Sequence, residues 1–219
     1  DKALKIVDLP GLYSLTVYSP DEAVSRDRVL NEKEYVAVNV CDANNLARNL
    51  FLTLQLMEAG ANVIIAANMT DELNAKGLYL DEKLLEKRLG VPVISISAKK
   101  GKSSFSVLDE CLRCDSGKRR YELPYLKKLP IENIAKIIEK NALNADLDPR
   151  YAAIKIIEND RFISEKLALN KAQQAGIRTL GDLQASLAKA RYEYIDEILA
   201  GAIKPRETGR KRAFIKNVS

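Results

Sequence analysis

The first half of the chain repeats one pattern, in which a short apolar run ends in polar residues and is followed by a stretch with helical spacing. The runs cover residues 3–7, 35–40, 62–67 and 91–96, and they are rich in Val and Ile. Continuous apolar runs of this length are typical of parallel strands that are buried on both faces. The pattern therefore predicts an α/β fold in which four strands alternate with helices.

Helix boundaries can be predicted from local signals between these runs. Ser19 is a suitable N-cap, Pro20 suits the first helical position, and Glu22 completes a capping box, so a helix is expected to begin there. Leucines at helical spacing precede both Gly60 and Gly90, and glycine commonly ends a helix. We expect these two helices to cover a face of the sheet.

After about residue 117 the strand-like runs disappear and only helical periodicity remains. Apolar stripes cover residues 131–138, 153–157 and 183–198, and Asp148-Pro149 forms a cap before the second stripe. We predict three segments: an α/β domain over residues 1–117, a small all-helical domain over 118–203, and a basic tail over 204–219.

Composition narrows the class of protein. The chain has 219 residues, a net charge of +5 and three cysteines, which are too few for a disulfide framework. It contains no apolar run of about 18 residues that could span a bilayer, so we expect this chain itself to be soluble. Cys111-x-x-Cys114 cannot complete a tetrahedral zinc site, because the chain has neither a second cysteine pair nor a histidine. The excess positive charge gathers in the tail (Arg206, Arg210, Lys211, Arg212 and Lys216).

The first apolar run ends in Asp8-Leu9-Pro10-Gly11, the D-x-x-G pattern of nucleotide triphosphatases. Asp8 is expected to hold Mg²⁺ through water. Gly11 has no side chain, so its backbone N–H can approach a terminal phosphate and its loop can rearrange when that phosphate is lost. Taken alone the signal is weak, because the same four residues also suit an ordinary turn after a strand.

The third run ends in Asn68-Met69-Thr70-Asp71, which is similar to the N-K-x-D element that selects guanine. The Asp71 carboxylate can accept from both the ring N–H and the exocyclic amine of guanine, a pair of donors that adenine lacks. Asn68 is suited to bracing the base and the loop. Met69 replaces the usual lysine, and it keeps the apolar contact with the base but loses the charge.

The fourth run leads into Ser97-Ala98-Lys99, which is similar to the S-A-K element that closes over the base. The backbone N–H of Ala98 is expected to donate to the guanine oxygen. The three elements occur in the right order, each directly after a predicted strand, and this order favours a guanine-nucleotide site far more than any single element does.

A phosphate-binding loop is missing from this pattern. Gly101-Lys102-Ser103 is only a partial match, because the G-x-x-x-x-G-K-[ST] motif requires glycine where the chain has Ile96. The chain opens inside a predicted strand. We therefore expect a P-loop GTPase-type parallel sheet that is incomplete at its N-terminus, with the phosphate loop on a segment before Asp1.

The sequence in and between these motifs resembles the cytosolic GTPase of the ferrous iron transport protein B family. Asp8-Leu9-Pro10-Gly11-Leu12-Tyr13-Ser14-Leu15, Asp42-Ala43-Asn44-Asn45-Leu46-Ala47-Arg48-Asn49-Leu50 and the methionine at position 69 carry the resemblance. In the second half, Arg150-Tyr151 and Ala190-Arg191-Tyr192 look like the family's helical spacer domain. The resemblance thus covers nearly the whole chain.

This resemblance implies a Mg²⁺-dependent GTP/GDP switch that hydrolyses GTP slowly and regulates ferrous iron uptake. It implies a transmembrane iron-permease region of the same full-length protein as partner, a position at the cytoplasmic face of the inner membrane, and a basic tail that leads towards that membrane. Leu12 stands where many GTPases place a water-orienting glutamine, so the catalytic group is unassigned and slow hydrolysis is expected. A homo-oligomer is left open.

Two other functions are compatible with the sequence. A ribosome- or RNA-associated GTPase would suit the pI of 9.0, but the helical half contains no recognisable RNA-binding module, so no nucleic acid is expected as partner. A nucleotide-free interaction scaffold is the alternative from a different class, because a chain without its phosphate loop could bind partners without turnover.

Overall fold

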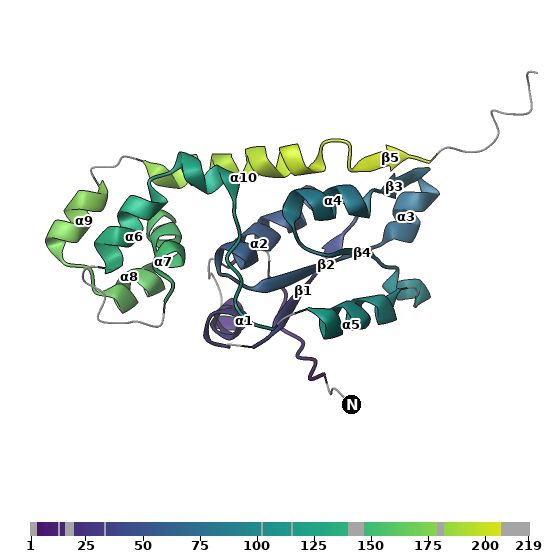
Figure 1. Ribbon diagram of the computed structural model, residues 1–219, viewed down its shortest axis with the longest axis horizontal. Helices are drawn as coiled ribbons and strands as arrows, with labels where there is room; N and C mark the ends of the chain where they lie inside the picture. Colours follow the sequence, from purple (N-terminus) through teal and green to yellow (C-terminus); the bar gives the residue numbers. More distant parts are fainter. Residues whose placement is uncertain are drawn as a thin grey trace, which may run out of the picture.

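The computed structural model describes residues 4–12, 14–15, 20–32, 34–101, 103–114, 116–139, 147–178 and 182–206. The first half contains a parallel sheet with helices on both faces, and the second half is mainly helical (Figure 1). Among the described residues, no helix is long and apolar enough to cross a membrane. The elements in chain order are α1 (Pro20–Asn31), β1 (Val36–Asp42), α2 (Leu46–Glu58), β2 (Asn62–Asn68), α3 (Thr70–Ala75), β3 (Leu78–Leu80), α4 (Glu82–Leu89), β4 (Val93–Ser95), η1 (Ala98–Lys100), α5 (Ser104–Arg113), η2 (Pro124–Lys128), α6 (Ile131–Glu139), α7 (Pro149–Ile157), α8 (Arg161–Leu167), α9 (Lys171–Arg178), α10 (Leu183–Leu199) and β5 (Ile203–Pro205).

Three of the four predicted strands form one parallel sheet with the order β1-β2-β4. The register of β1 and β2 runs from Val36 opposite Asn62 to Asp42 opposite Asn68, and β4 pairs with β2 at Ile65 opposite Val93. Because the strands are parallel, Asp42 and Asn68 end side by side at the carboxyl edge. The α/β prediction for the first half is confirmed.

The predicted strand at residues 3–7 is wrong in this structure. Residues 4–7 belong to no strand, and residue 3 lies outside the described ranges. Leu4, Ile6 and Val7 are 45%, 75% and 46% exposed. A strand exists only through hydrogen bonds to a neighbour, and in the part of the chain that the structure describes β1 pairs with β2 alone. An apolar run supplies the composition of a strand but not its partner.

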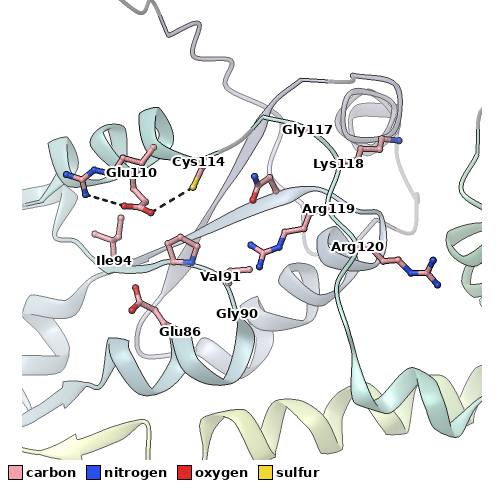
Figure 2. A pocket seen from close by; sticks show the side chains of 13 residues that line it. Glu86, Gly90, Val91, Ile94, Glu110, Cys114, Gly117, Lys118, Arg119 and Arg120 are labelled. Carbon is pink, nitrogen blue, oxygen red and sulfur yellow. Dashed lines mark hydrogen bonds and ion pairs between the residues drawn. The ribbon is translucent and has the colours of Figure 1, made fainter.

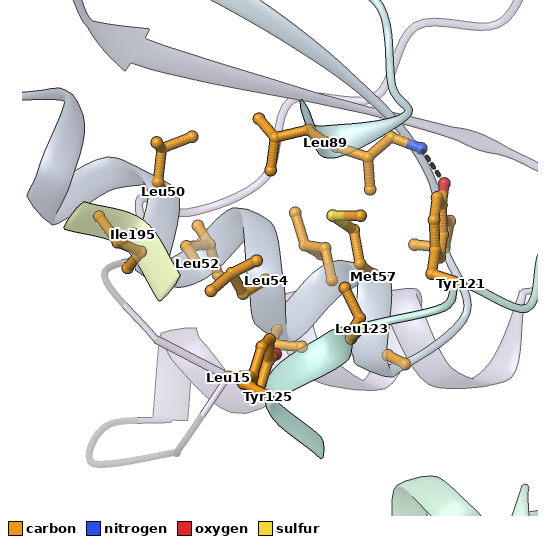
Figure 3. Close-up of a cluster of buried hydrophobic side chains, with 14 of the residues drawn as sticks. Leu15, Leu50, Leu52, Leu54, Met57, Leu89, Tyr121, Leu123, Tyr125 and Ile195 are labelled. Atoms are coloured by element: carbon orange, nitrogen blue, oxygen red, sulfur yellow. Dashed lines mark hydrogen bonds between the residues drawn. The ribbon is translucent and has the colours of Figure 1, made fainter. Parts of the chain in front are cut away.

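Helices cover the two faces of the sheet unequally. Helices α2 and α4 pack on one face, and α5 packs on the other against Ala66 and Ile96. The larger core gathers around α2, where Leu50, Leu54 and Met57 belong to the same buried cluster as Leu123 and Tyr125 from the segment after the sheet (Figure 3). The helix predicted before Gly60 therefore ends as expected and covers the sheet.

Capping signals located two helices well. Helix α1 begins at Pro20, as predicted, although Ser19, its expected cap, lies outside the described residues. Asp148 accepts hydrogen bonds from the backbone N–H groups of Arg150 and Tyr151, so it caps α7 as expected. Residues 207–219, which include most of the basic tail, lie outside the described ranges.

The helical prediction for the second half is confirmed, and a short strand follows its last helix. Strand β5 pairs in antiparallel fashion with β3, with Leu80 opposite Ile203 and Leu78 opposite Pro205. The pairing joins residues more than a hundred positions apart, so no local pattern marks it. Helix α10 contacts α7 as well as α2 and α4, and it runs along both halves of the molecule (Figure 1).

Candidate functional site

One side chain joins two of the predicted motifs at the carboxyl edge of the sheet. Asn68 ends β2, and its Oδ1 accepts hydrogen bonds from the backbone N–H of Met69 at 2.8 Å and of Ala98 at 3.0 Å. The first bond shapes its own loop and the second fixes the turn that follows β4. Asn68 thus holds the 68–71 loop and the 97–100 turn next to each other.

Thr70 provides a second link between the same two segments. Its Oγ1 donates to the carbonyl oxygen of Ile96 at 2.8 Å, and its backbone N–H donates to the same oxygen at 3.3 Å. Met69 takes a left-handed conformation with φ of 62°, which turns the chain sharply from β2 into α3. Its side chain is 41% exposed, so it lies at the surface of the site.

Asp71 places a negative charge beside the 97–100 turn. Its Oδ2 lies 3.1 Å from Nζ of Lys100, and its side chain is 20% exposed. Ser97 and Lys100 lower the pKa of Asp71 below its ordinary value, so the carboxylate is ionised at neutral pH. The Ser97 hydroxyl is buried and makes no hydrogen bond in the structure, although it lies near enough to influence Asp71.

The loop after β1 is braced by the carboxylate of Asp42. Asp42 accepts from the backbone N–H of Asn44 at 2.8 Å and from the side-chain amide of Asn45 at 3.0 Å. Burial raises the pKa of Asp42, but these hydrogen bonds bring it below its ordinary value. Lys76 Nζ donates to Asn44 Oδ1 at 2.6 Å, so the end of α3 is tied to the same loop.

The D-x-x-G segment lies on the surface and is held by other elements. Asp8, Pro10 and Gly11 are exposed and Leu9 is half-buried. Ser25 Oγ on α1 donates to the Pro10 carbonyl oxygen at 3.1 Å. This hydrogen bond ties the D-x-x-G segment to α1. The other predicted site residues lie together at the edge of β2 and β4: Asn68, Met69, Asp71, Ser97, Ala98 and Lys99.

The end of the same loop is anchored deep in the protein. Leu12 packs partly against the core and Leu15 is fully buried. Gln55 on α2 accepts through Oε1 from Ser14 Oγ at 3.0 Å and from the Leu15 backbone N–H at 2.8 Å. No local pattern predicts that Gln55 holds this loop, because Ser14 and Leu15 lie 41 and 40 residues away from it.

Helix α1 also contacts the helical half. The guanidinium of Arg26 lies 3.6 Å from Asp160 Oδ2, and both side chains are almost completely buried. The same guanidinium lies 4.3 Å from the centre of the Phe162 ring. Helix α1, whose Ser25 donates to the Pro10 carbonyl oxygen, therefore packs directly against the α7–α8 connection.

A buried cluster of charges connects α2, α7 and α10. Arg191 donates from Nε to Glu58 Oε1 at 2.9 Å and from Nη2 to Glu58 Oε2 at 2.6 Å. Arg191 also binds Glu158, whose other oxygen accepts from Lys155 Nζ at 2.6 Å. The two positive and two negative charges balance, which is the condition under which buried charges are tolerated. Tyr125 OH donates to Glu58 Oε1 at 2.5 Å.

A cavity of about 990 Å³ lies at the opposite, amino edge of the sheet (Figure 2). Asn62 at the start of β2 and Pro92 just before β4 line it, together with several basic side chains. Two of these are already paired, since Arg113 lies 3.6 Å from Glu110 and Arg119 lies over the Tyr121 ring. None of the predicted site residues lines this cavity, so it is separate from the edge where the motifs gather.

Comparison with known families covers both halves of the chain. The sequence model of the ferrous iron transport protein B family matches residues 1–111. The model of the FeoB cytosolic helical domain matches residues 130–204. The two matches correspond to the sheet-containing part and to the helices from α6 to α10, with β5 at the end of the second.

Curated relatives of this chain include proteins named as Fe(2+) transporters. The chain is 36% identical over 212 residues to the Fe(2+) transporter FeoB of Methanocaldococcus jannaschii, covering 91% of this chain and 32% of that protein. It is 32% identical over 226 residues to a Fe(2+) transport protein A/Fe(2+) transporter FeoB fusion protein of Porphyromonas gingivalis, covering 93% and 26%. The chain therefore spans about a third or less of the length of these relatives.

Solved structures share the fold. The mGMPPNP-bound NFeoB from S. thermophilus superposes with a TM-score of 0.76 at 32% identity, over 89% of this chain and 78% of that one. The cytosolic domain of the T. maritima FeoB iron transporter in apo form superposes with a TM-score of 0.75 at 26% identity, over 90% and 79%. These matches confirm a parallel sheet with helices followed by a helical domain.

Proposed function

Because this chain belongs to the ferrous iron transport protein B family, we propose that it binds guanine nucleotides at the carboxyl edge of β2 and β4 and acts as a switch for a ferrous iron transporter. The observation that carries the proposal is the bond between Asn68 Oδ1 and the Ala98 N–H at 3.0 Å. This bond places the two base-recognition elements together, with Asp71 ionised beside them.

The base is recognised by donor and acceptor matching. Asp71 accepts from the ring N–H and the exocyclic amine of guanine, while Ala98 N–H donates to the guanine oxygen. Met69 and Lys99 flank the base, and Ser97 supplies a buried hydroxyl next to Asp71. GDP- and GMPPNP-bound FeoB relatives have the same fold, which supports the choice of a guanine nucleotide.

Mg²⁺ and the terminal phosphate belong to the D-x-x-G segment. The exposed carboxylate of Asp8 is a hard oxygen ligand of the kind that Mg²⁺ prefers. A Cβ added at Gly11 would meet nothing within 4 Å, so the backbone there is open to a close approach. When bound, Mg²⁺ neutralises phosphate charge, while Asp8 orients it and Gly11 N–H contacts the phosphate.

Hydrolysis is expected to be slow. Leu12 directly follows Gly11 and packs partly into the core, and a hydrocarbon side chain cannot orient an attacking water. No catalytic residue is assigned on this chain. A slow reaction suits a regulatory switch, in which each nucleotide state must last long enough to act on a partner.

The partner of this switch is the transmembrane iron-permease region of the full-length protein, at the cytoplasmic face of the membrane. The relatives named as Fe(2+) transporters are about three to four times as long as this chain, which leaves room for such a region. The three segments 1–117, 118–203 and 204–219 are proposed as the nucleotide-binding domain, the helical spacer and the basic connection to the membrane.

A nucleotide titration of the full-length protein tests the proposal. Fluorescent GDP should bind, GDP should displace it and ADP should not, and Asp71→Ala should weaken binding at least about tenfold because both donors of guanine lose their acceptor. Asp196→Ala on the exposed surface of α10 is the matched control and should bind as the unmodified protein does. Equal competition by ADP, or no binding, would instead favour an interaction scaffold.

A further inference from the structure

Gln55 on α2 holds the described end of the loop that follows the D-x-x-G motif. Its side chain is 1% exposed, and its Oε1 accepts from both Ser14 and Leu15. Leu15 is fully buried and its backbone N–H points at this oxygen at 2.8 Å. Leu15, four residues after Gly11, is therefore held in place partly by the orientation of the Gln55 carboxamide.

Glu158, from the helical half, sets that orientation. Gln55 Nε2 donates to Glu158 Oε1 at 3.3 Å. An ionised carboxylate only accepts and a backbone N–H only donates, so the carboxamide can pair with both groups in one orientation alone. The opposite orientation would place two donors together at Leu15 and two acceptors together at Glu158.

Glu158 is itself held firmly, so it is a fixed reference point. Lys155 Nζ and Arg191 both bind its carboxylate, and Arg191 is in turn bound by Glu58. Burial raises the pKa of Glu158, but Lys155 and Arg191 lower it below its ordinary value, which keeps the carboxylate an acceptor. Gln55 is thus placed between a rigid cluster and the loop.

We propose that Gln55 is a positioning residue through which Glu158 of the helical half sets the conformation of the loop after D-x-x-G, and so the preference of that loop for GTP over GDP. The proposal rests on the proposed function, because the loop matters for nucleotide binding only if Gly11 contacts the terminal phosphate. Any movement of Leu15 away from Gln55 leaves a buried carboxamide unpaired beside Glu158. The helical half therefore favours the loop conformation in which Leu15 pairs with Gln55.

Hydrogen exchange on this chain tests the mechanical link without nucleotide. Gln55→Leu removes the acceptor for Leu15, so exchange at the Leu15 amide should rise at least about tenfold. Thr53→Val is the matched control, because it removes a buried hydrogen bond on the same helix, from Asn39 at 2.8 Å, that does not touch the loop. Thr53→Val should leave the Leu15 amide protected. Equal protection at Leu15 in Gln55→Leu and the unmodified chain would overturn the proposal.

The contribution of Glu158 needs its own variant. Glu158→Gln keeps the shape but replaces an obligate acceptor with a group that can rotate, so exchange at Leu15 should rise although the substitution lies just after α7. Lys155→Met disturbs the other oxygen of Glu158 and not the bond to Gln55, and it should raise exchange at Leu15 less than Glu158→Gln does. If the two variants change Leu15 equally, Glu158 does not act through Gln55.

Nucleotide binding by the full-length protein completes the test. Gln55→Leu should change the ratio of GTPγS to GDP affinity by about five- to tenfold, whereas Thr53→Val should leave the ratio unchanged. An unaltered ratio in Gln55→Leu, with normal guanine binding, overturns the proposed role of Gln55. Absence of guanine binding by the unmodified protein overturns the proposed function instead, and the exchange result at Leu15 distinguishes the two failures.

Discussion

Arg191 on α10 binds Glu58 on α2 with two parallel hydrogen bonds, Nε to Oε1 at 2.9 Å and Nη2 to Oε2 at 2.6 Å. Both side chains are at most 2% exposed. Burial alone lowers the pKa of Arg191, but the neighbouring Glu58 carboxylate raises it by more. The net pKa lies above its ordinary value, so the guanidinium stays charged. This pair fastens the long helix of the second half to the core of the first half.

Replacement of Arg191 should therefore be costly. Arg191→Met leaves Glu58 and Glu158 buried without their shared cation, and the free energy of unfolding should fall by about 3–5 kcal/mol. Urea unfolding followed by circular dichroism measures the change. Lys189→Ala on the same helix removes only an exposed pair with Glu193 and should cost less than about 0.5 kcal/mol. Similar losses for the two variants would mean that the cluster contributes little.

The sequence predicts those parts of the fold that local composition determines. The runs behind β1, β2 and β4 are rich in Val, Ile and Ala, and such runs are recognisable without their partners. Residues 4–7 have the same composition, but they are exposed and belong to no strand, because strand formation also needs a neighbouring edge. Strands β3 and β5 are three residues each and were missed, since only their mutual pairing defines them.

The same distinction applies to the candidate site. Asn68, Asp71 and Ala98 belong to short motifs, so their positions can be read locally. Thr70 and Lys100 lie inside or next to those motifs and could have been found, because each is an obvious donor beside a predicted acceptor. The partners of Gln55 and Arg191 could not be predicted, because they lie 103 and 133 residues away and only the packing of α7 and α10 brings them together.

Acid should weaken the protein partly through Glu158. Its folded pKa lies below its ordinary value of 4.5, so the unfolded state takes up the proton first as the pH falls. The stabilisation is complete above about pH 4.5 and is lost as the pH drops through the folded pKa. Glu158→Gln should be less stable at pH 7, and its difference from the unmodified chain should shrink as the pH is lowered from 7 to below 4.5. Urea unfolding across this range measures it, and a constant difference would contradict the assignment.

The three thiols should differ sharply in reactivity. Burial raises the pKa of Cys41 to about 12, and its side chain is fully buried in β1, so almost no thiolate forms at pH 8. Cys111 and Cys114 are partly exposed at the end of α5. Iodoacetamide at pH 8 should therefore label Cys111 and Cys114 in the folded chain and label Cys41 only in denaturant. Peptide mass spectrometry reads each site, and rapid labelling of Cys41 would show that β1 opens readily.

Asp148 and Asp182 occupy equivalent positions at the starts of two helices, and they offer a direct test of how much a cap stabilises the helical half. Asp148 accepts from the backbone N–H groups of Arg150 and Tyr151, and Pro149 fits the first turn of α7. Asp182 stands before α10 but makes no hydrogen bond to that helix with its side chain. Asp148→Ala should lower the free energy of unfolding by about 0.5–2 kcal/mol because two backbone donors lose their acceptor.

Asp182→Ala should cost only a few tenths of a kcal/mol, since only the interaction with the helix dipole is lost. Thermal unfolding of both variants at pH 7 compares them under identical conditions, and the Asp148 variant should have the lower Tm. A larger loss for Asp182→Ala would mean that its carboxylate caps α10 in solution. Equal losses would mean that the backbone of α7 is fixed by the packing of Tyr151 and Ile154 rather than by its cap.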